Sequence, residues 1–276
     1  MSLRMFGQAA TSMYHLQQQL DQIGHNLSNL QSPGYKTRNA EFSSLLSQHI
    51  NNLTANENSQ NRLTPDGIRV GTGGRLGSIN YNFQIGAAQR TDRPLDVMLT
   101  NEQQFFEVII QDGNDEEILL TRDGSFYLNP IGDNTLMLVT KDGHPVNGIN
   151  GPIQFASQQI EDIQINDNGM VIVNRNGQQE IVGTIAVTEV IQPRLLEAVG
   201  ENFLRIPNLD ELGINEADIL QIPQNGNLMQ SGVLEMSNVK VEEQMTQMMM
   251  AQRAYQFNAR SISMADQMQG LINNIR

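Results

Sequence analysis

Apolar residues recur every seven positions near both ends of the chain, and this repeat constrains the fold more than any other feature. The N-terminal rows are Phe6, Met13, Leu20 and Leu27, with Leu16, Ile23 and Leu30 beside them, and the C-terminal row is Val241, Met248, Tyr255 and Ile262. A seven-residue repeat keeps one stripe of a helix facing a partner helix. We therefore predict two terminal helices that pair as a coiled-coil-like stalk, with these residues as a self-assembly seam. Such ends are more typical of an assembly subunit than of an enzyme.

Local signals place the ends of both helices. Residues 3–30 contain no proline, and Ser32-Pro33-Gly34 then ends the first helix, because proline cannot continue it and glycine tolerates the turn. Ser237 is a good N-cap for the last helix, and Glu242 and Glu243 suit the positive end of its dipole. We expect that helix to continue to about Asn273.

The residues between the helices favour β structure. Short strand-like runs alternate there with turn pairs that are typical of hairpins: Asp112-Gly113, Asp123-Gly124, Asp142-Gly143, Asn168-Gly169 and Asn176-Gly177. We interpret residues 95–206 as a β barrel or sandwich. The apolar residues of 42–50 suggest a second helical piece, followed by a soft linker over 51–61.

These observations predict an α+β fold: a mainly-β central domain, as a barrel or sandwich, with long terminal helices. The predicted division has two parts. Residues 1–64 together with 225–276 form a discontinuous helical polymerisation domain, and residues 65–224 form the central β domain with its extended connections.

Charge and composition exclude several kinds of partner. The formal net charge is −13, which argues against nucleic acid as a partner. Arg4, Lys36 and Arg38 against Asp21 give residues 1–38 a charge of +2, and residues 234–276 are neutral, so the middle is strongly acidic. No window approaches ~18 consecutive apolar residues, so we expect no direct membrane insertion. The absence of cysteine excludes disulfides and thiolate chemistry.

No motif indicates catalysis, a cofactor or a metal. The four histidines form no i, i+4 ligand pair, and no nucleophile elbow is present. The run 70–75 is glycine-rich but lacks the lysine and the helix of a phosphate loop, so a flexible or extended loop is the better interpretation. The acidic run 112–117 lacks EF-hand spacing and fits a solvated turn. The methionines at 245 and 248–250 fit either core packing or a helix face that packs in several environments.

Three motifs, in order, cover most of the chain. The first runs from Asn26-Leu27-Ser28-Asn29 to Gly34-Tyr35-Lys36, and the second is Arg93-Pro94-Leu95-Asp96-Val97 with Phe105-Phe106 and Thr121-Arg122-Asp123-Gly124. The third joins Leu234-Glu235-Met236-Ser237-Asn238 to Gln252-Arg253-Ala254-Tyr255. Together they closely resemble the flagellar basal-body rod and hook protein family. The compact middle is most similar to the distal-rod type, or to the paired rod-like proteins of Gram-positive bacteria.

The resemblance implies a structural subunit of the flagellar basal-body rod that polymerises through its terminal helices and transmits torque for motility. It also implies export by the flagellar type III apparatus, assembly with itself and with other rod and hook proteins, and no enzymatic activity or cofactor. The alternative is a secreted β-domain module that binds a ligand and is oligomerised by its terminal helices.

Overall fold

The computed structural model describes residues 2–44, 47–50, 68–71, 74–112, 115–132, 134–200, 202–207, 215, 219–221, 223 and 228–274. The chain forms two compact units. The helical unit contains residues 1–27, 38–80 and 240–276, and the β unit contains residues 28–37 and 81–239. The expected linker over 51–61 lies outside the described residues. The division expected from the sequence, with a polymerisation domain of residues 1–64 and 225–276 and a β domain of residues 65–224, stays a prediction.

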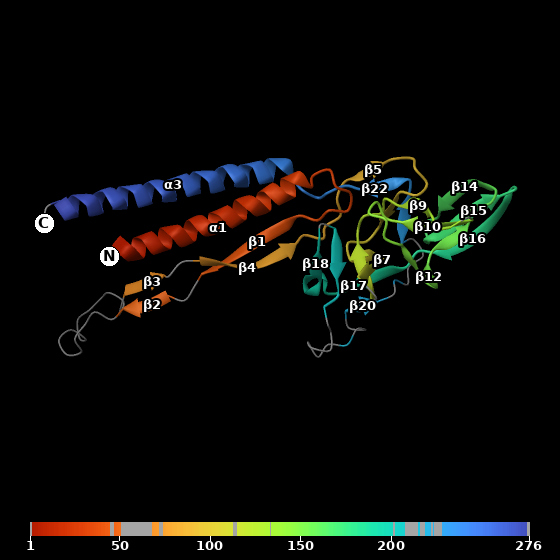
Figure 1. Ribbon diagram of the computed structural model, residues 1–276, viewed down its shortest axis with the longest axis horizontal. Coiled ribbons are helices and arrows are strands. Elements are labelled where there is room, and N and C mark those ends of the chain that lie inside the picture. Colours follow the sequence, from red (N-terminus) through yellow and green to blue (C-terminus); the bar gives the residue numbers. More distant parts are fainter. Residues whose placement is uncertain are drawn as a thin grey trace. The chain divides into compact units, whose positions relative to one another are not determined.

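Two antiparallel helices dominate the helical unit, α1 (Ser2–Ser28) and α3 (Val241–Asn274). They lie side by side, and the start of α1 and the end of α3 lie at the same end of this unit (Figure 1). The side-chain amide of Asn26, near the end of α1, donates a 3.1 Å hydrogen bond to that of Gln244, near the start of α3. Over the described residues, neither helix is apolar enough to cross a bilayer.

The start of α3 differs from the expectation. The helix begins at Val241, four residues after Ser237, and its first backbone bond runs from the Gln244 N–H to the Lys240 carbonyl. Ser237 therefore does not cap the helix. Its hydroxyl accepts a bond from the Val239 N–H in an extended segment instead. Glu242 and Glu243 do occupy the first turn, as expected.

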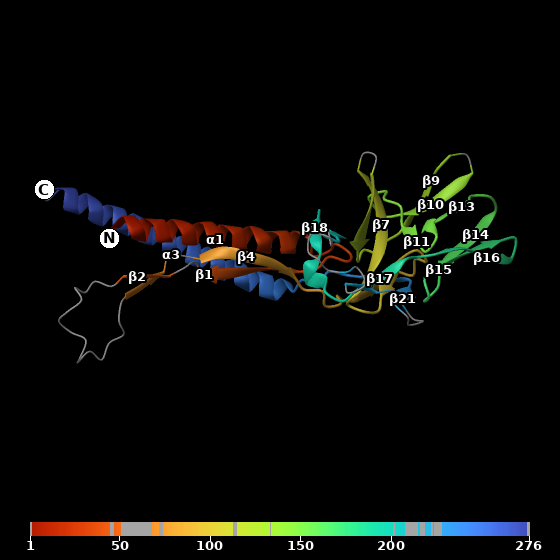
Figure 2. The ribbon, with the colours of Figure 1, turned by 90° about the horizontal axis from the view of Figure 1, so that it is seen from below.

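Strands accompany the helices in the helical unit, where the sequence predicted a second helical piece. The strands β1 (Arg38–Ser44) and β4 (Gly74–Tyr81) pair with each other and lie beside α1 (Figure 2), and β2 (Ser47–Ile50) pairs with β3 (Ile68–Gly71). The prediction of a helix over 42–50 was wrong. Apolar residues at mixed spacings within nine positions fit either structure, and pairing with a distant strand decided the outcome.

The β unit is built on an open antiparallel sheet with the strand order β18-β19-β8-β7-β17-β20. Its strands are β7 (Gln104–Asp112), β8 (Asp115–Thr121), β17 (Val187–Val190), β18 (Glu197–Val199), β19 (Phe203–Arg205) and β20 (Leu220–Gln221). The 3₁₀ turn η1 (Pro193–Leu195) precedes β18.

Smaller antiparallel sheets complete this unit. The order β14-β15-β16 joins β14 (Ile160–Ile165), β15 (Met170–Arg175) and β16 (Gln178–Thr184), and the order β13-β10-β9 joins β13 (Gln154–Ala156), β10 (Thr135–Val139) and β9 (Tyr127–Pro130). The two-stranded pairs are β11 (Asn147–Gly148) with β12 (Gly151–Pro152), β21 (Met229–Ser231) with β6 (Val97–Leu99), and β22 (Val233–Glu235) with β5 (Ala88–Arg90).

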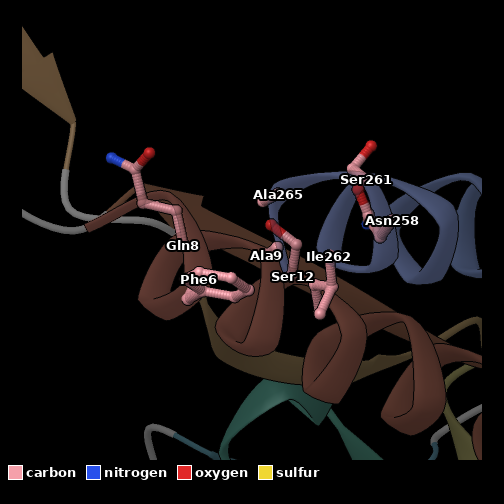
Figure 3. Close-up of a pocket in the computed structure, with 8 residues that line it drawn as sticks. All are labelled: Phe6, Gln8, Ala9, Ser12, Asn258, Ser261, Ile262 and Ala265. Carbon is pink, nitrogen blue, oxygen red and sulfur yellow. The ribbon is translucent and has the colours of Figure 1, made fainter. Parts of the chain in front are cut away.

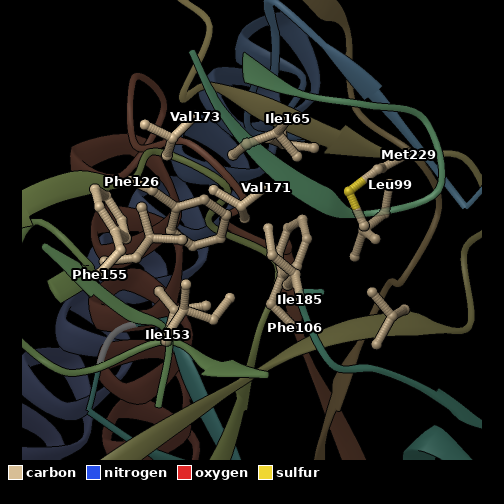
Figure 4. Close-up of a cluster of buried hydrophobic side chains, with 14 residues drawn as sticks. Leu99, Phe106, Phe126, Ile153, Phe155, Ile165, Val171, Val173, Ile185 and Met229 are labelled. Atoms are coloured by element: carbon tan, nitrogen blue, oxygen red, sulfur yellow. The ribbon is translucent and has the colours of Figure 1, made fainter. Parts of the chain in front are cut away.

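Two apolar cores flank strand β7. Successive side chains of a strand point to opposite faces, so the adjacent Phe105 and Phe106 enter different cores. Phe106 belongs to the larger core and meets Phe126 edge-to-face, with ring centroids 5.1 Å apart (Figure 4). Phe105 belongs to the smaller core, where its ring contacts Phe83 edge-to-face at 5.6 Å. The paired phenylalanines therefore join two sides of the β unit.

The expected fold class requires correction. Over the residues that the structure describes, the chain is mainly β with one N-terminal and one C-terminal helix, and the β structure is not one central barrel or sandwich. The six-stranded sheet is open, the other described sheets have two or three strands each, and further strands lie in the helical unit. Turn pairs and apolar runs indicate hairpins but do not state whether those hairpins close into a barrel, which depends on strand tilt and register.

Candidate functional site

The predicted seam residues lie on the sheltered sides of the helices. Ile23 is buried, with 3% of its surface exposed, and the other ten seam side chains are half-buried. Leu30 is the exception in position, because α1 ends at Ser28 and Leu30 belongs to the β unit. The apolar rows are therefore sheltered but not sealed.

Gaps between the helices show why the seam is not sealed. An open cavity of about 250 Å³ separates the N-terminal part of α1 from the C-terminal part of α3. It is lined by Phe6, Gln8, Ala9, Ser12, Asn258, Ser261, Ile262 and Ala265 (Figure 3). Knobs-into-holes packing fills such space with side chains. The coiled-coil-like stalk was therefore wrong for a single chain: the helices pack together but leave gaps.

The sequence pattern missed half of the inner face of α3. Gln244, Ala251 and Ala265 are buried there, in a row with half-buried Asn258. They alternate with the predicted row at spacings of three and four, which completes a heptad pattern. Small and amide side chains carry no apolar signal, so only their spacing from the predicted row could have indicated them.

Asn26 fixes the start of strand β1 against the helices. Its side-chain amide donates to the Arg38 carbonyl at 2.9 Å, and its carbonyl oxygen accepts from the Arg38 N–H at 3.0 Å. The same NH₂ group also donates to Gln244. One buried side chain thus satisfies both backbone groups of a residue twelve positions away, which explains an asparagine at this place in the motif.

A buried group of three charged residues, here called the charge clasp, joins the three motifs within the β unit. Lys36 donates to Glu235 Oε1 at 2.6 Å, and Arg122 donates to Glu235 Oε2 through Nε at 3.0 Å and Nη2 at 2.7 Å. At most 5% of each side chain is exposed. Lys36 also donates to the backbone carbonyl of Gln84, and Arg122 donates to the backbone carbonyls of Asn101 and Gln104. Fully bonded buried charges of this kind hold distant segments in one arrangement.

Close backbone packing accompanies the charge clasp. Gly34 has φ +69°, and a Cβ there would lie 2.5 Å from the backbone carbon of Arg122 and the nitrogen of Asp123. Only glycine fits such a position. The expected hairpin turn at Asp123-Gly124 was wrong: this segment is buried, and a Cβ on Gly124 would lie 1.8 Å from the Val97 carbonyl oxygen.

Asn238 ties together the segments by which the chain enters and leaves the β unit. Its carbonyl oxygen accepts from the N–H and hydroxyl of Thr37 at 2.8 and 2.7 Å. Its NH₂ group donates to the carbonyls of Asn82 and Gln84 at 2.7 and 2.9 Å. Residues 37, 81 and 239 border the helical unit in the chain. Asn238 therefore joins three segments of the β unit that adjoin the helical unit in the chain.

The remaining motif residues fall into two groups. Tyr35, Asn29, Asp96 and Ser237 are buried in the β unit, Leu95 packs partly buried against its larger core, and the Pro94 carbonyl accepts from the Ser231 hydroxyl. On α3, Gln252, Arg253 and Ala254 are exposed, whereas Tyr255 is half-buried. The first group has a structural explanation within the subunit. For the exposed residues of α3, burial within the subunit gives no such explanation.

Burial and charge shift two pKa values in the charge clasp. Burial, together with the like charge of Arg122, lowers the pKa of Lys36 from 10.5 to about 8, although Glu235 acts in the opposite direction. Burial alone would raise the pKa of Glu235. The charges of Arg122 and Lys36 and the hydrogen bonds from Lys36 and Gly86 outweigh it, so the pKa lies below its usual value.

The stability of the β unit should respond to pH through Lys36. Between about pH 8 and 10.5 the unfolded chain holds the Lys36 proton and the native chain has lost it, so the free energy of unfolding should rise with pH over this window. Denaturation followed by near-ultraviolet circular dichroism would measure the slope. Lys36→Met should make that slope less positive, and equal slopes would contradict the assignment. The Glu235 contribution is lost progressively as the pH falls below about 4.5, because the unfolded chain takes up the carboxyl proton before the native chain does.

Comparison with known proteins adds independent information. A family profile described as "Flagellar basal body rod FlgEFG protein C-terminal" matches residues 230–275, and one described as "Flagellar hook protein FlgE/F/G D1 domain" matches residues 101–173. The chain is 38% identical to the flagellar hook-basal body complex protein FlhP of Bacillus subtilis, covering 99% of this chain and all of that one. It is 32% identical to the flagellar basal-body rod protein FlgG of Borreliella burgdorferi, covering 99% of both. The chain belongs to the flagellar basal-body rod and hook protein family.

Membership in the rod and hook family confirms the resemblance found in the sequence. The chain is a structural protein of the flagellar basal body, not an enzyme, and it assembles with other basal-body components. The described residues contain no group of acidic or histidine side chains that could hold a metal. Nothing in the matches supports the ligand-binding alternative.

Proposed function

We propose that this chain polymerises through the faces of α1 and α3 into the axial rod of the flagellar basal body. The observation that supports this best is the burial of the predicted seam. Nine of the ten seam side chains on α1 and α3 are only half-buried within one chain, over rows that extend from Phe6 to Leu27 and from Val241 to Ile262. The apolar surface that one chain leaves uncovered is then available to a neighbouring copy.

Torque transmission requires that strain pass through each subunit without loosening it. The charge clasp and Asn238 support this role, because they fix the segments that connect the β unit to the helices. Asn26 and Gln244 do the same where β1 meets α1 and α3 in the helical unit. The family resemblance further implies delivery to the growing rod by the flagellar type III export apparatus.

Electron microscopy of the purified full chain at rising concentration tests the proposal. We expect helical polymers of variable length, because one surface of each copy contacts a different surface of the next. A heterologous contact of this kind does not close on itself. Discrete dimers or trimers at every concentration would contradict polymerisation and would favour helices that merely oligomerise the chain.

A further inference from the structure

The exposed face of α1 has a regular composition. Between Phe6 and Ser28 the exposed residues are Gly7, Ala10, Tyr14, Gln17, Asp21 and Ser28. Their spacings of three, four and seven place them on one stripe of the helix, which also contains Gly24. Three of the seven residues are glycine or alanine, so parts of this stripe are almost bare backbone.

The two glycines of this stripe have no use inside the subunit. A Cβ on Gly7 or Gly24 would meet no described atom within 4 Å, and neither residue has a positive φ. Glycine within a helix is less favourable than alanine, so nothing in the described structure compensates for its presence. A helix surface with so little side-chain bulk allows another helix to approach closely.

The opposite kind of surface lies on α3. Met250, Phe257, Met264 and Leu271 recur every seven residues and are 58, 69, 54 and 64% exposed. Exposed Ala254 and Met268 lie beside them. At 3.5 residues per turn this outer row is turned by roughly 130° from the side that faces α1. A contiguous exposed apolar row at heptad spacing fits a helix as its partner.

We propose that the outer row of α3 receives the glycine-containing stripe of α1 from a second copy of this chain. The inference rests on the proposed function, and it names the surfaces that make contact. Charge favours this pairing, because Arg253 and Arg260 border the outer row of α3 and Asp21 lies on the stripe of α1. Copies that follow one another around a helical assembly keep nearly the same direction, so these helices meet antiparallel, as α1 and α3 do within one chain.

One register satisfies both the charges and the shapes. When Asp21 of one copy lies opposite Arg253 of the next, antiparallel counting sets Gly24 opposite Met250 and Ala10 opposite Met264. Large side chains then lie over small residues, as in knobs-into-holes packing. Tyr14 falls opposite Arg260 in this register, a pairing in which a cation lies against an aromatic ring.

Disulfide trapping between two copies tests the contact, and the natural chain offers no competing thiol because it contains no cysteine. A short-tagged Ala10→Cys chain and a long-tagged Met264→Cys chain are mixed, concentrated until polymers form, and oxidised. We expect a mixed disulfide in polymers and none in dilute monomer. Replacing Met264→Cys by Ser263→Cys, on an exposed face outside both rows, should abolish it.

Each outcome has a separate meaning. Wild-type polymers without the mixed disulfide would overturn this contact and leave the proposed function standing. If the wild-type chain forms no polymer at all, the proposed function and the contact fail together.

Glycine substitutions provide a second measurement that does not depend on oxidation. Gly24→Leu should raise the concentration needed for polymerisation at least tenfold without lowering the melting temperature of the monomer, because a Cβ at this position meets no described atom within 4 Å and leucine is a better helix former than glycine. The matched control is Gly270→Leu, which also has open space around it but lies outside the outer row of α3. Equal polymerisation of Gly24→Leu and wild type would overturn the contact.

Discussion

Glu235→Ala is expected to lower the free energy of unfolding of the β unit by about 3–5 kcal/mol. The substitution leaves two buried cations, Lys36 and Arg122, without their shared anion, and breaking a buried ion pair from one side costs about this much. The backbone N–H of Gly86 also loses its acceptor, which lies 2.9 Å away. Chemical denaturation of the full chain, followed by near-ultraviolet circular dichroism of the buried aromatic residues, measures the change.

The control for this prediction is an ion pair in the same unit that solvent reaches. Glu180→Ala removes the partner of Arg175, and the Glu180 side chain is 56% exposed, so its loss should cost less than about 1 kcal/mol. Lys36→Met should fall between the two, because Glu235 keeps its two bonds from Arg122. If Glu235→Ala is no more destabilising than Glu180→Ala, the charge clasp does not hold the motifs together.

Leu27→Asp and Tyr255→Asp are each expected to abolish polymerisation and motility. Both side chains are half-buried within the subunit, so a carboxylate there stays partly hydrated in the monomer. When a neighbouring copy covers the remaining surface, the unpaired charge loses that water, at a cost of several kcal/mol per subunit. A helical polymer repeats this cost at every contact.

The monomer provides the internal check. Melting of the β unit should be unchanged in both variants, because residues 27 and 255 belong to the helical unit. Gln256→Asp makes the same change in charge one residue along α3, at an exposed position, and should leave polymerisation and swimming intact. If the Gln256→Asp strain loses motility as completely as the Tyr255→Asp strain, position on the seam is not what matters.

The sequence predicted those elements that have a local signal in their own residues. The heptad rows located both helices to within a few residues, and Asn176-Gly177 forms the expected tight turn between β15 and β16, with φ of 50° and 74°. Strand pairing over long distances was beyond such patterns. The pairing of β1 with β4 depends on chain segments some thirty residues apart, and it overrode the apolar spacing that suggested a helix.

The candidate site was predictable only in part for a similar reason. The motif residues Lys36 and Glu235 are 199 positions apart in the sequence. No local sequence pattern shows that both belong to one buried ion-pair cluster with Arg122. The inner row of Gln244, Ala251 and Ala265 carries no apolar signal. The outer row of α3 does carry an apolar signal. Whether that row is exposed or buried depends on which side of α3 packs against α1, and the sequence pattern alone does not show this.

Imaging basal bodies from cells that lack the gene, and that carry a plasmid copy of the wild-type chain, Tyr255→Asp or Gln256→Asp, tests the central claim most directly. We expect rods to stop short in cells without a plasmid copy and in cells with Tyr255→Asp. Rods should reach full length with the wild-type chain and with Gln256→Asp. Full-length rods and normal swimming with Tyr255→Asp, at wild-type protein levels, would contradict polymerisation through the terminal helices.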